Sequence, residues 1–438
     1  ESWYNPSNWN GSSSWDFENV WAISQYVNDG YPYLIEAKNL FPDNTDLFWT
    51  DDEVTKDTSF AGSGTENDPY LISSEEELAG LAYNVNFGGN NYSGAYFKQT
   101  ADIDVSAYWW DPIGGGEYDA DAESYISLDG FCGNYDGNNN TISGIFTLGE
   151  ENFQGLFGCV IGSSTSNRVV IENIVVSNSI IHGTALSSAI CGLVKYGELL
   201  NLKTEASVRL VEVGEFSGII AGQIEESILR NSVNYGEITA TSGTTGAVVG
   251  RNYNSSLVAD CVNYGTMFGT SNCAGIAGRC EENSITKNSI NYGEVKANNV
   301  VGGGVVGANM FDSLVTNCIN YGRVTGLHYI GGVVGETEYS TVSYCKNFGT
   351  VTVLEAHFDG TGGIVGTTDV NTPGATSYIL YCENYGEVKS DTDEAGNIGG
   401  ILGNAEKNIQ IANCANFVEI SGQGNVSGIL GGLSTIAN

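Results

Sequence analysis

The residues of this sequence that could act as catalytic acids are not paired with bases. Glycoside hydrolysis needs two carboxylates roughly 5–10 Å apart, and polysaccharide lyases need a basic residue close to a calcium ion held by aspartates. None of the candidate acids recurs together with a Lys or Arg, and in a chain with 52 acidic and 16 basic residues isolated carboxylates are expected by chance. We therefore predict no catalytic residues. The candidate acids are Asp312, Glu336, Glu338 and Asp369.

The sequence also lacks a recognisable metal site. DADAE (119–123) has neither the glycine nor the bidentate acid of an EF-hand loop. The three histidines, His182, His328 and His357, lie in HGTAL, HYIGG and HFDGT, and no HExxH is present. We expect no metal and no cofactor. Trp3, Trp9, Trp15 and Trp21 could stack on sugars, although packing is the interpretation favoured for aromatic residues of this kind.

A repeat of about 28 residues organises the chain from residue 218 onward, and two signatures alternate in it. The first is a pentamer of two small residues, two aliphatic residues and Gly, such as GGVVG at 303–307 and 331–335. The second is Asn-aromatic-Gly with a small residue two positions earlier, such as CINYG at 318–322. A fixed period of this size predicts stacked units that are buried only by their neighbours.

The short runs between the glycines are rich in Val, Ile, Thr and Tyr, which favours strands over helices. One period can hold about three short strands and three corners, which is the content of one coil of a parallel β-helix. The sequence therefore predicts an all-β, right-handed parallel β-helix of about ten coils.

Equivalent positions of successive coils should form columns with a spacing of about 4.8 Å. The small residues should stack inside: Ser232, Cys261, Ser289, Cys318, Cys345, Cys382 and Cys414. The amides should satisfy one another, and could also take a left-handed backbone at a corner: Asn234, Asn263, Asn291, Asn320, Asn347, Asn384 and Asn416. The rings should form a stack beside them: Tyr235, Tyr264, Tyr292, Tyr321, Phe348, Tyr385 and Phe417. The glycine after each ring is expected to have a positive φ.

The chain before the repeats predicts a cap. Ser74 and Glu77 form a capping box, and Leu78, Leu81, Ala82 and Val85 share one face of the helix that should follow and end at Gly88. We expect this helix to cover the open end of the solenoid, because an uncapped first coil exposes unpaired strand groups. At least one of Trp109 and Trp110 should be buried against the helix.

The ten cysteines do not require disulfides. The five in the small-residue column point the same way at a separation beyond that of a disulfide, so we interpret them as buried thiols. Cys273 and Cys280, which flank AGIAG, are the pair to check for a bond.

The formal charge of −36 makes nucleic acid an unsuitable partner, since phosphate binding needs a basic face. No run approaches the 18 or so apolar residues of a membrane span, so we expect no membrane insertion. We expect a monomer, with a host or matrix protein or a glycan as the possible partner.

The order GTENDPYLISSEEELAGLA, ADIDVS, GNYDGNNNTISG and GLFG resembles the GLUG-motif repeat proteins of bacterial cell surfaces. GLFG (155–158) matches the motif directly, and the resemblance covers about residues 60–438. It implies a secreted or wall-attached, adhesin-like protein with a β-solenoid, and it carries no catalytic residues. Residues 1–35 resemble the segment that closes such a repeat block.

These observations divide the chain into four parts: 1–35, the tail of a preceding block or an accessory segment; 36–59, an acidic linker; 60–150, the N-terminal cap and first coils; and 151–438, the solenoid repeats. The predicted function is a non-catalytic, extracellular or cell-surface protein whose solenoid is a stiff spacer or ligand-display face. The alternative is a carbohydrate-active β-helix enzyme, either a polysaccharide lyase or a glycosidase.

Overall fold

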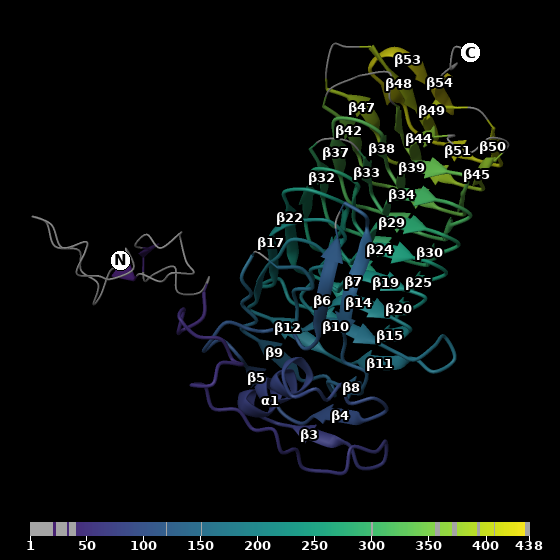
Figure 1. Ribbon diagram of the computed structural model, residues 1–438. Helices are drawn as coiled ribbons and strands as arrows, with labels where there is room; N and C mark the ends of the chain where they lie inside the picture. The colour runs from purple at the N-terminus through teal and green to yellow at the C-terminus, as the bar shows by residue number, and fades with distance from the viewer. Residues whose placement is uncertain are drawn as a thin grey trace, which may run out of the picture.

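The computed structural model describes residues 41–433, apart from 120, 150, 299–300, 355–359, 370–374, 392–394 and 407. It also describes two short antiparallel strands, β1 (Trp21–Ala22) and β2 (Tyr33–Leu34). The remainder is a parallel β-helix that rises from the N-terminal helix to the C-terminal coil (Figure 1). The predicted fold class is confirmed.

Each regular coil contains five short strands rather than the three predicted, and like strands of successive coils pair in parallel to form five sheets. Sheet 1 has twelve strands, so the solenoid has about twelve coils where about ten were expected. The extra strands within each coil have a local cause: corner residues with left-handed backbones, such as Asn288 and Asn317, permit turns between strands only two to five residues long. The coil count differs because five strands of sheet 1, from β3 to β15, precede the regular repeats.

The strands of sheet 1 are β3 (Tyr70–Ile72), β4 (Tyr96–Gln99), β8 (Asn134–Asp136), β11 (Val169–Glu172), β15 (Gly197–Leu200), β20 (Ile228–Arg230), β25 (Leu257–Ala259), β30 (Ile285–Lys287), β35 (Leu314–Thr316), β40 (Thr341–Ser343), β45 (Ser377–Leu380) and β50 (Ile409–Ala412). Those of sheet 2 are β5 (Ile103–Asp104), β9 (Thr141–Ser143), β12 (Val175–Ser177), β16 (Lys203–Thr204), β21 (Val233–Asn234), β26 (Val262–Asn263), β31 (Ile290–Asn291), β36 (Ile319–Asn320), β41 (Lys346–Asn347), β46 (Glu383–Asn384) and β51 (Ala415–Asn416). Those of sheet 3 are β13 (Ile180–His182), β17 (Arg209–Val213), β22 (Glu237–Ala240), β27 (Met267–Gly269), β32 (Val295–Ala297), β37 (Val324–Gly326), β42 (Val351–Val353), β47 (Val388–Ser390) and β52 (Ile420–Ser421).

The strands of sheet 4 are β18 (Ser217–Gly218), β23 (Thr245–Gly246), β28 (Cys273–Ala274), β33 (Gly302–Gly303), β38 (Ile330–Gly331), β43 (Thr361–Gly362), β48 (Ala395–Gly399) and β53 (Gln423–Ser427). Those of sheet 5 are β10 (Phe157–Ile161), β14 (Cys191–Lys195), β19 (Ala221–Glu225), β24 (Val249–Tyr253), β29 (Ala277–Glu281), β34 (Val306–Met310), β39 (Val334–Glu338), β44 (Val365–Asp369), β49 (Leu402–Ala405) and β54 (Leu430–Leu433).

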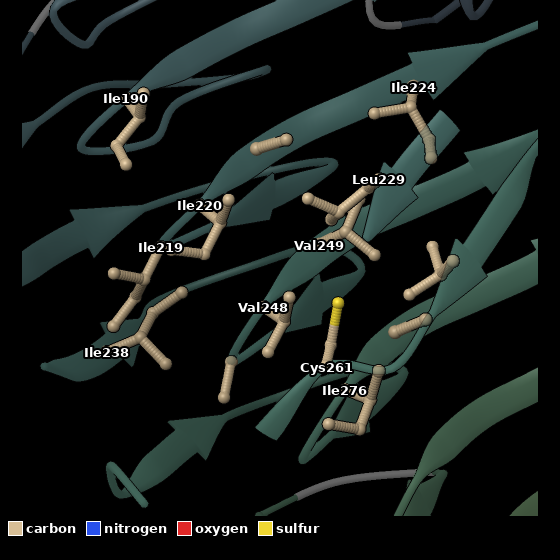
Figure 2. Packing of buried hydrophobic residues seen from close by; sticks show 14 of the residues in the cluster. Ile190, Ile219, Ile220, Ile224, Leu229, Ile238, Val248, Val249, Cys261 and Ile276 are labelled. Atoms are coloured by element: carbon tan, nitrogen blue, oxygen red, sulfur yellow. The ribbon is translucent and has the colours of Figure 1, made fainter. Parts of the chain in front are cut away.

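The pentamer of each repeat turns the chain from sheet 4 into sheet 5 and supplies the core. Its two aliphatic side chains are fully buried in successive coils, as for Ile219 and Ile220 and for Val333 and Val334. Ile219, Ile220 and Val248 lie near one another in the interior (Figure 2). Burial of each such side chain contributes about 1.5–3 kcal/mol, so the solenoid is stabilised coil by coil.

Helix α1 (Glu75–Asn86) lies at the N-terminal end of the solenoid (Figure 1). Ser74 Oγ accepts a hydrogen bond from Glu77 N, as the capping box predicts, but the Glu77 carboxylate reaches back to Ser73 N at 2.6 Å. The predicted helix face is buried and belongs to the same apolar cluster as the first coils and Trp110. Trp109 and Trp110 are both buried.

Residues 41–59, within the segment predicted as a linker, pack against these first coils. Trp49 is buried and its Nε1 donates to the Val105 carbonyl at 2.7 Å, and Asp57 N donates to the Glu76 carbonyl at 2.9 Å. The acidic composition of this segment led to the prediction of a linker, whereas Trp49 anchors it to the first coils.

Candidate binding surface

Seven aromatic rings form a continuous column at the corner between sheets 2 and 3. We call this set the aromatic column; it consists of the seven rings predicted to stack, from Tyr235 to Phe417. Adjacent ring centroids are 4.6–5.0 Å apart and their planes differ by 4–12°. Each side chain remains 37–58% exposed. The predicted stack is confirmed, and it faces solvent.

The asparagine column directly beneath fixes the height of every ring. Each Asn Nδ2 donates to the Oδ1 of the next coil at 2.8–2.9 Å, from Asn234 to Asn416. Each amide also bonds within its own coil: in Asn320, for example, Nδ2 donates to the Gly322 carbonyl and Oδ1 accepts from Gly322 N. From Asn234 to Asn384, all donors and acceptors of these buried amides are therefore used, as the sequence predicted.

The glycines that follow the rings have a different purpose from the one predicted. None of Gly236, Gly265, Gly293, Gly322, Gly349 and Gly386 has a positive φ. A Cβ atom on Gly322 would instead lie 1.9 Å from the carbonyl oxygen of Gly293, and the other stacked pairs give 1.7–2.0 Å. The expectation of a positive φ was wrong: glycine is required because successive backbones approach too closely for a side chain.

The left-handed backbone that the sequence suggested for the column asparagines lies elsewhere. It occurs at the residue just before each inward small residue, at the corner between sheets 1 and 2. We call these residues the corner column, and their φ values are 54–56°: Asn173, Asn201, Asn231, Asp260, Asn288, Asn317, Tyr344, Tyr381 and Asn413. Asn317 Nδ2 donates to Asn288 Oδ1 at 2.9 Å, so the amide members also interact with one another.

Two members of the corner column break its pattern, and we call them the tyrosine pair. The rings of Tyr344 and Tyr381 stack with centroids 4.8 Å apart and planes 3° apart, and they are 56% and 46% exposed. Their coils also carry Lys346 and Glu383, which form an ion pair at 2.7 Å between the tyrosine pair and the aromatic column. The tyrosine pair was not predicted, although Tyr in place of Asn or Asp before Cys345 and Cys382 is visible in the sequence.

The surface beside the aromatic column is apolar in the middle and charged at its margin. Val233, Val262, Ile290 and Ile319 form a half-buried column on the sheet 2 side. Glu237, Arg323 and Glu387 are exposed on the sheet 3 side. Because the stacked ring faces cover one another, the aromatic column presents mainly ring edges and hydroxyl groups. Such a surface has the composition of a binding surface.

A second distinctive surface is covered by the antiparallel hairpin of β6 (Gly115–Asp119) and β7 (Ser124–Asp129), which lies across sheet 5 (Figure 1). The Tyr125 hydroxyl donates to Glu225 Oε2 at 3.2 Å and accepts from Gln223 Nε2 at 2.5 Å. Beneath the hairpin, Arg251 pairs with Glu281 and with Glu123, the latter at 3.4 Å. Arg251 therefore forms an ion pair with each of these two glutamates, and the pair with Glu123 attaches the hairpin to sheet 5.

The structure brings together three of the four candidate acids. Glu336 and Glu338 lie on β39, and Glu338 is the register partner of Asp369 on β44. Glu338 is 3% exposed. Asp312 lies instead at the corner between sheets 5 and 1, with a φ of 61°. Because β39 and β44 are adjacent strands of sheet 5, the backbones of Glu338 and Asp369 are one strand spacing apart, about 4.8 Å.

The other candidate residues are dispersed. In DADAE, Asp119 Oδ1 accepts from Asp121 N and Ala122 N in the hairpin turn, and Glu123 pairs with arginines. His182 lies on β13 and His328 between sheets 3 and 4. His357 and the Trp3, Trp9, Trp15 and Trp21 side chains lie outside the described residues. Within the described ranges, no three His, Cys, Asp or Glu residues are placed to hold a metal ion.

All ten cysteines are free thiols, including Cys273 and Cys280, which lie on β28 and β29. The four column cysteines from Cys261 to Cys382 are fully buried, and Cys414 in the last coil is half-buried. Burial raises the pKa of the Cys345 thiol well above its ordinary value, which keeps it unreactive.

No known protein family matches the sequence, and no curated protein does. Among solved structures, the chain is similar to the crystal structure of a putative immunoglobulin A1 protease from Bacteroides ovatus, with 15% identity and a TM-score of 0.33. The similarity covers 84% of this chain and 86% of that one. At that score it supports no argument about activity. In the described part of the chain, no helix is long and apolar enough to span a membrane.

Proposed function

We propose that this protein is a non-catalytic, secreted or cell-surface, adhesin-like binding protein whose solenoid displays the aromatic column to a host or matrix partner. The observation that carries the proposal is the exposure of seven stacked rings in one line. Monomeric proteins rarely expose contiguous apolar surface without a partner for it. The column is also preorganised, so binding would order few side chains and lose little conformational entropy.

The anatomy of the surface supports a binding role. A strip of aromatic and half-buried aliphatic residues with charged residues at its margin is typical of protein interfaces, in which tyrosine is enriched. The GLUG-like motif order in the sequence agrees with a surface-exposed repeat protein. The net charge of −36 favours a neutral or basic partner.

The test is a binding assay of the full chain against immobilised collagen, fibronectin and laminin and against a glycan array. The triple variant Tyr264→Ser, Tyr292→Ser, Tyr321→Ser should weaken the observed binding at least tenfold. Phe87→Ser, which removes a ring that is 66% exposed at the end of α1, is the matched control and should leave binding unchanged. Absence of binding together with turnover of a polysaccharide would overturn the proposal.

One observation favours the alternative of a carbohydrate-active enzyme: the adjacency of Glu338 and Asp369 on sheet 5. A retaining glycosidase needs two acidic residues close together, and these two are register partners on adjacent strands. If that alternative holds, the full chain releases reducing sugar from a polysaccharide and Glu338→Gln abolishes the release. Release that persists in Glu338→Gln would exclude this pair as the catalytic site.

A further inference from the structure

The tyrosine pair occupies positions at which its residue type is conformationally unfavourable. Tyr344 and Tyr381 have φ of 54° and 55°, whereas the other members of the corner column are Asn or Asp. Asn and Asp tolerate the left-handed region well, while a bulky aromatic residue there is an outlier. The two tyrosines therefore replace the usual small polar residue of this corner with large rings that are 56% and 46% exposed.

From this placement we infer that the tyrosine pair, with Lys346, Glu383 and the adjacent rings of Phe348 and Tyr385, forms a binding subsite for a neutral glycan chain. The inference rests on the proposed function and specifies the ligand class for one part of the displayed surface. It concerns the two coils that contain β41 and β46, and not the earlier coils in which Val233, Val262, Ile290 and Ile319 lie beside the aromatic column.

The arrangement of ring faces suits sugar binding at this subsite. Inside the aromatic column each ring face is covered by the next ring, but the tyrosine pair has only two members. Its neighbours in the corner column are Asn317 and Asn413, so one face of each tyrosine ring is free of another ring. The apolar face of a pyranose can stack on such a face.

The polar groups needed for hydroxyl recognition lie between the two sets of rings. Lys346 Nζ is 2.7 Å from Glu383 Oε2, and the two side chains are 44% and 33% exposed. Tyr385 hydroxyl donates to the same Glu383 side chain at 3.1 Å. An ammonium group supplies donors and a carboxylate supplies acceptors, so this pair can bond to the donor and acceptor sides of sugar hydroxyls.

Two properties narrow the ligand class. Lys346 and Glu383 interrupt the apolar column formed by Val262, Ile290 and Ile319 in earlier coils, and charged residues are depleted at the centre of protein interfaces. A polyhydroxylated ligand therefore fits better than an apolar protein surface. A polyanionic glycan is disfavoured because the chain carries a net charge of −36.

The test uses the double variant Tyr344→Asn, Tyr381→Asn in the full chain. Asn is the residue that other coils place at the same corner, so the variant should fold with an unchanged or higher melting temperature. Affinity electrophoresis in gels that contain mannan, hydroxyethyl cellulose, galactan or dextran should show retardation of the wild type by at least one polysaccharide. The double variant should lose at least tenfold in affinity. Tyr339→Asn, at another left-handed corner with its ring 36% exposed, is the control and should bind as the wild type.

Equal retardation of the wild type and a folded double variant would overturn the inference, as would the absence of retardation by all four polysaccharides. If either result is accompanied by matrix-protein binding that requires Tyr264, Tyr292 and Tyr321, the inference fails while the proposed function stands. If no ligand of either class depends on any of these rings, both fail.

Discussion

At the scale of the residue, the interior columns allow very little chemical variation. The Cys345 side chain faces the core and is fully buried, next to Cys318 and Cys382 in the same column. Cys345→Asp would place a carboxylate there without a cationic partner. We expect a loss of about 4 kcal/mol or more of unfolding free energy, measured by thermal melting. Cys345→Ser is the control, since Ser232 and Ser289 occupy this column; a melting temperature of Cys345→Asp close to that of the control would contradict the inward-facing column.

The pentamer glycines provide a second test at this scale. A Cβ atom on Gly363 would lie 2.2 Å from the carbonyl oxygen of Gly400, whereas one on Gly428, the same position in the last coil, would contact nothing. Gly363→Ala should therefore cost about 1–3 kcal/mol and Gly428→Ala well under half of that, measured by urea denaturation. Equal effects would show that backbone entropy, and not close approach, selects these glycines.

At the scale of the element, the hairpin of β6 and β7 depends on charges of very different exposure. Glu281 is 4% exposed and pairs with the buried Arg251, whereas the Glu123 side chain is 42% exposed. Glu281→Gln should cost about 3–5 kcal/mol because it leaves a buried guanidinium poorly compensated. Glu123→Gln should cost at most about 1 kcal/mol. Chemical denaturation of both variants measures the difference, and the reverse order would show that the hairpin turn dominates.

The docking of residues 41–59 introduces a pH dependence. Burial raises the pKa of Asp111, which accepts a hydrogen bond from the Thr50 hydroxyl, to about 6. Because the folded state holds this proton more tightly than the unfolded state, the stabilisation from Asp111 is complete below about pH 4 and is lost as pH rises to about 6. Asp111→Asn should match the wild type at pH 4 and exceed its stability by roughly 1–3 kcal/mol at pH 8. A constant difference between the two proteins across this range would contradict the assignment.

The sequence predicts the columns but not the elements that cover them. Repetition identifies which residues share a column, and residue type indicates what an interior amide or thiol can do there. It does not show that the Gly322 backbone lies against that of Gly293, because close approach and positive φ both select glycine. The hairpin occurs once and the tyrosine occupies this corner in only two coils, so neither gives a periodic signal. The hairpin residue Glu123 and its partner Arg251 are also far apart in sequence.

At the scale of the whole molecule, stability should decrease toward the C-terminal coil. The inward-facing Ile411 and Ile420 are half-buried, whereas their counterparts one coil earlier, Ile379 and Val388, are fully buried. We expect amides of β50–β54 to exchange with solvent hydrogen faster than those of β30–β34, because terminal units of a solenoid lack one neighbour. Hydrogen exchange with mass spectrometry measures the gradient. Uniform protection along the solenoid would show that the end coil is covered.

The asparagine column also separates the rise of the solenoid from the length of chain in each turn. Asn320 and Asn347 are 27 residues apart, and Asn347 and Asn384 are 37 apart, yet both pairs are joined by bonds of 2.9 Å. Ten extra residues therefore leave the spacing between levels unchanged. Foreign sequences inserted between the strands of the coil from Asn347 to Asn384, or the excision of one complete coil, should preserve the alignment of the coils above and below. The architecture thus permits a graduated series of otherwise identical proteins that differ only in height.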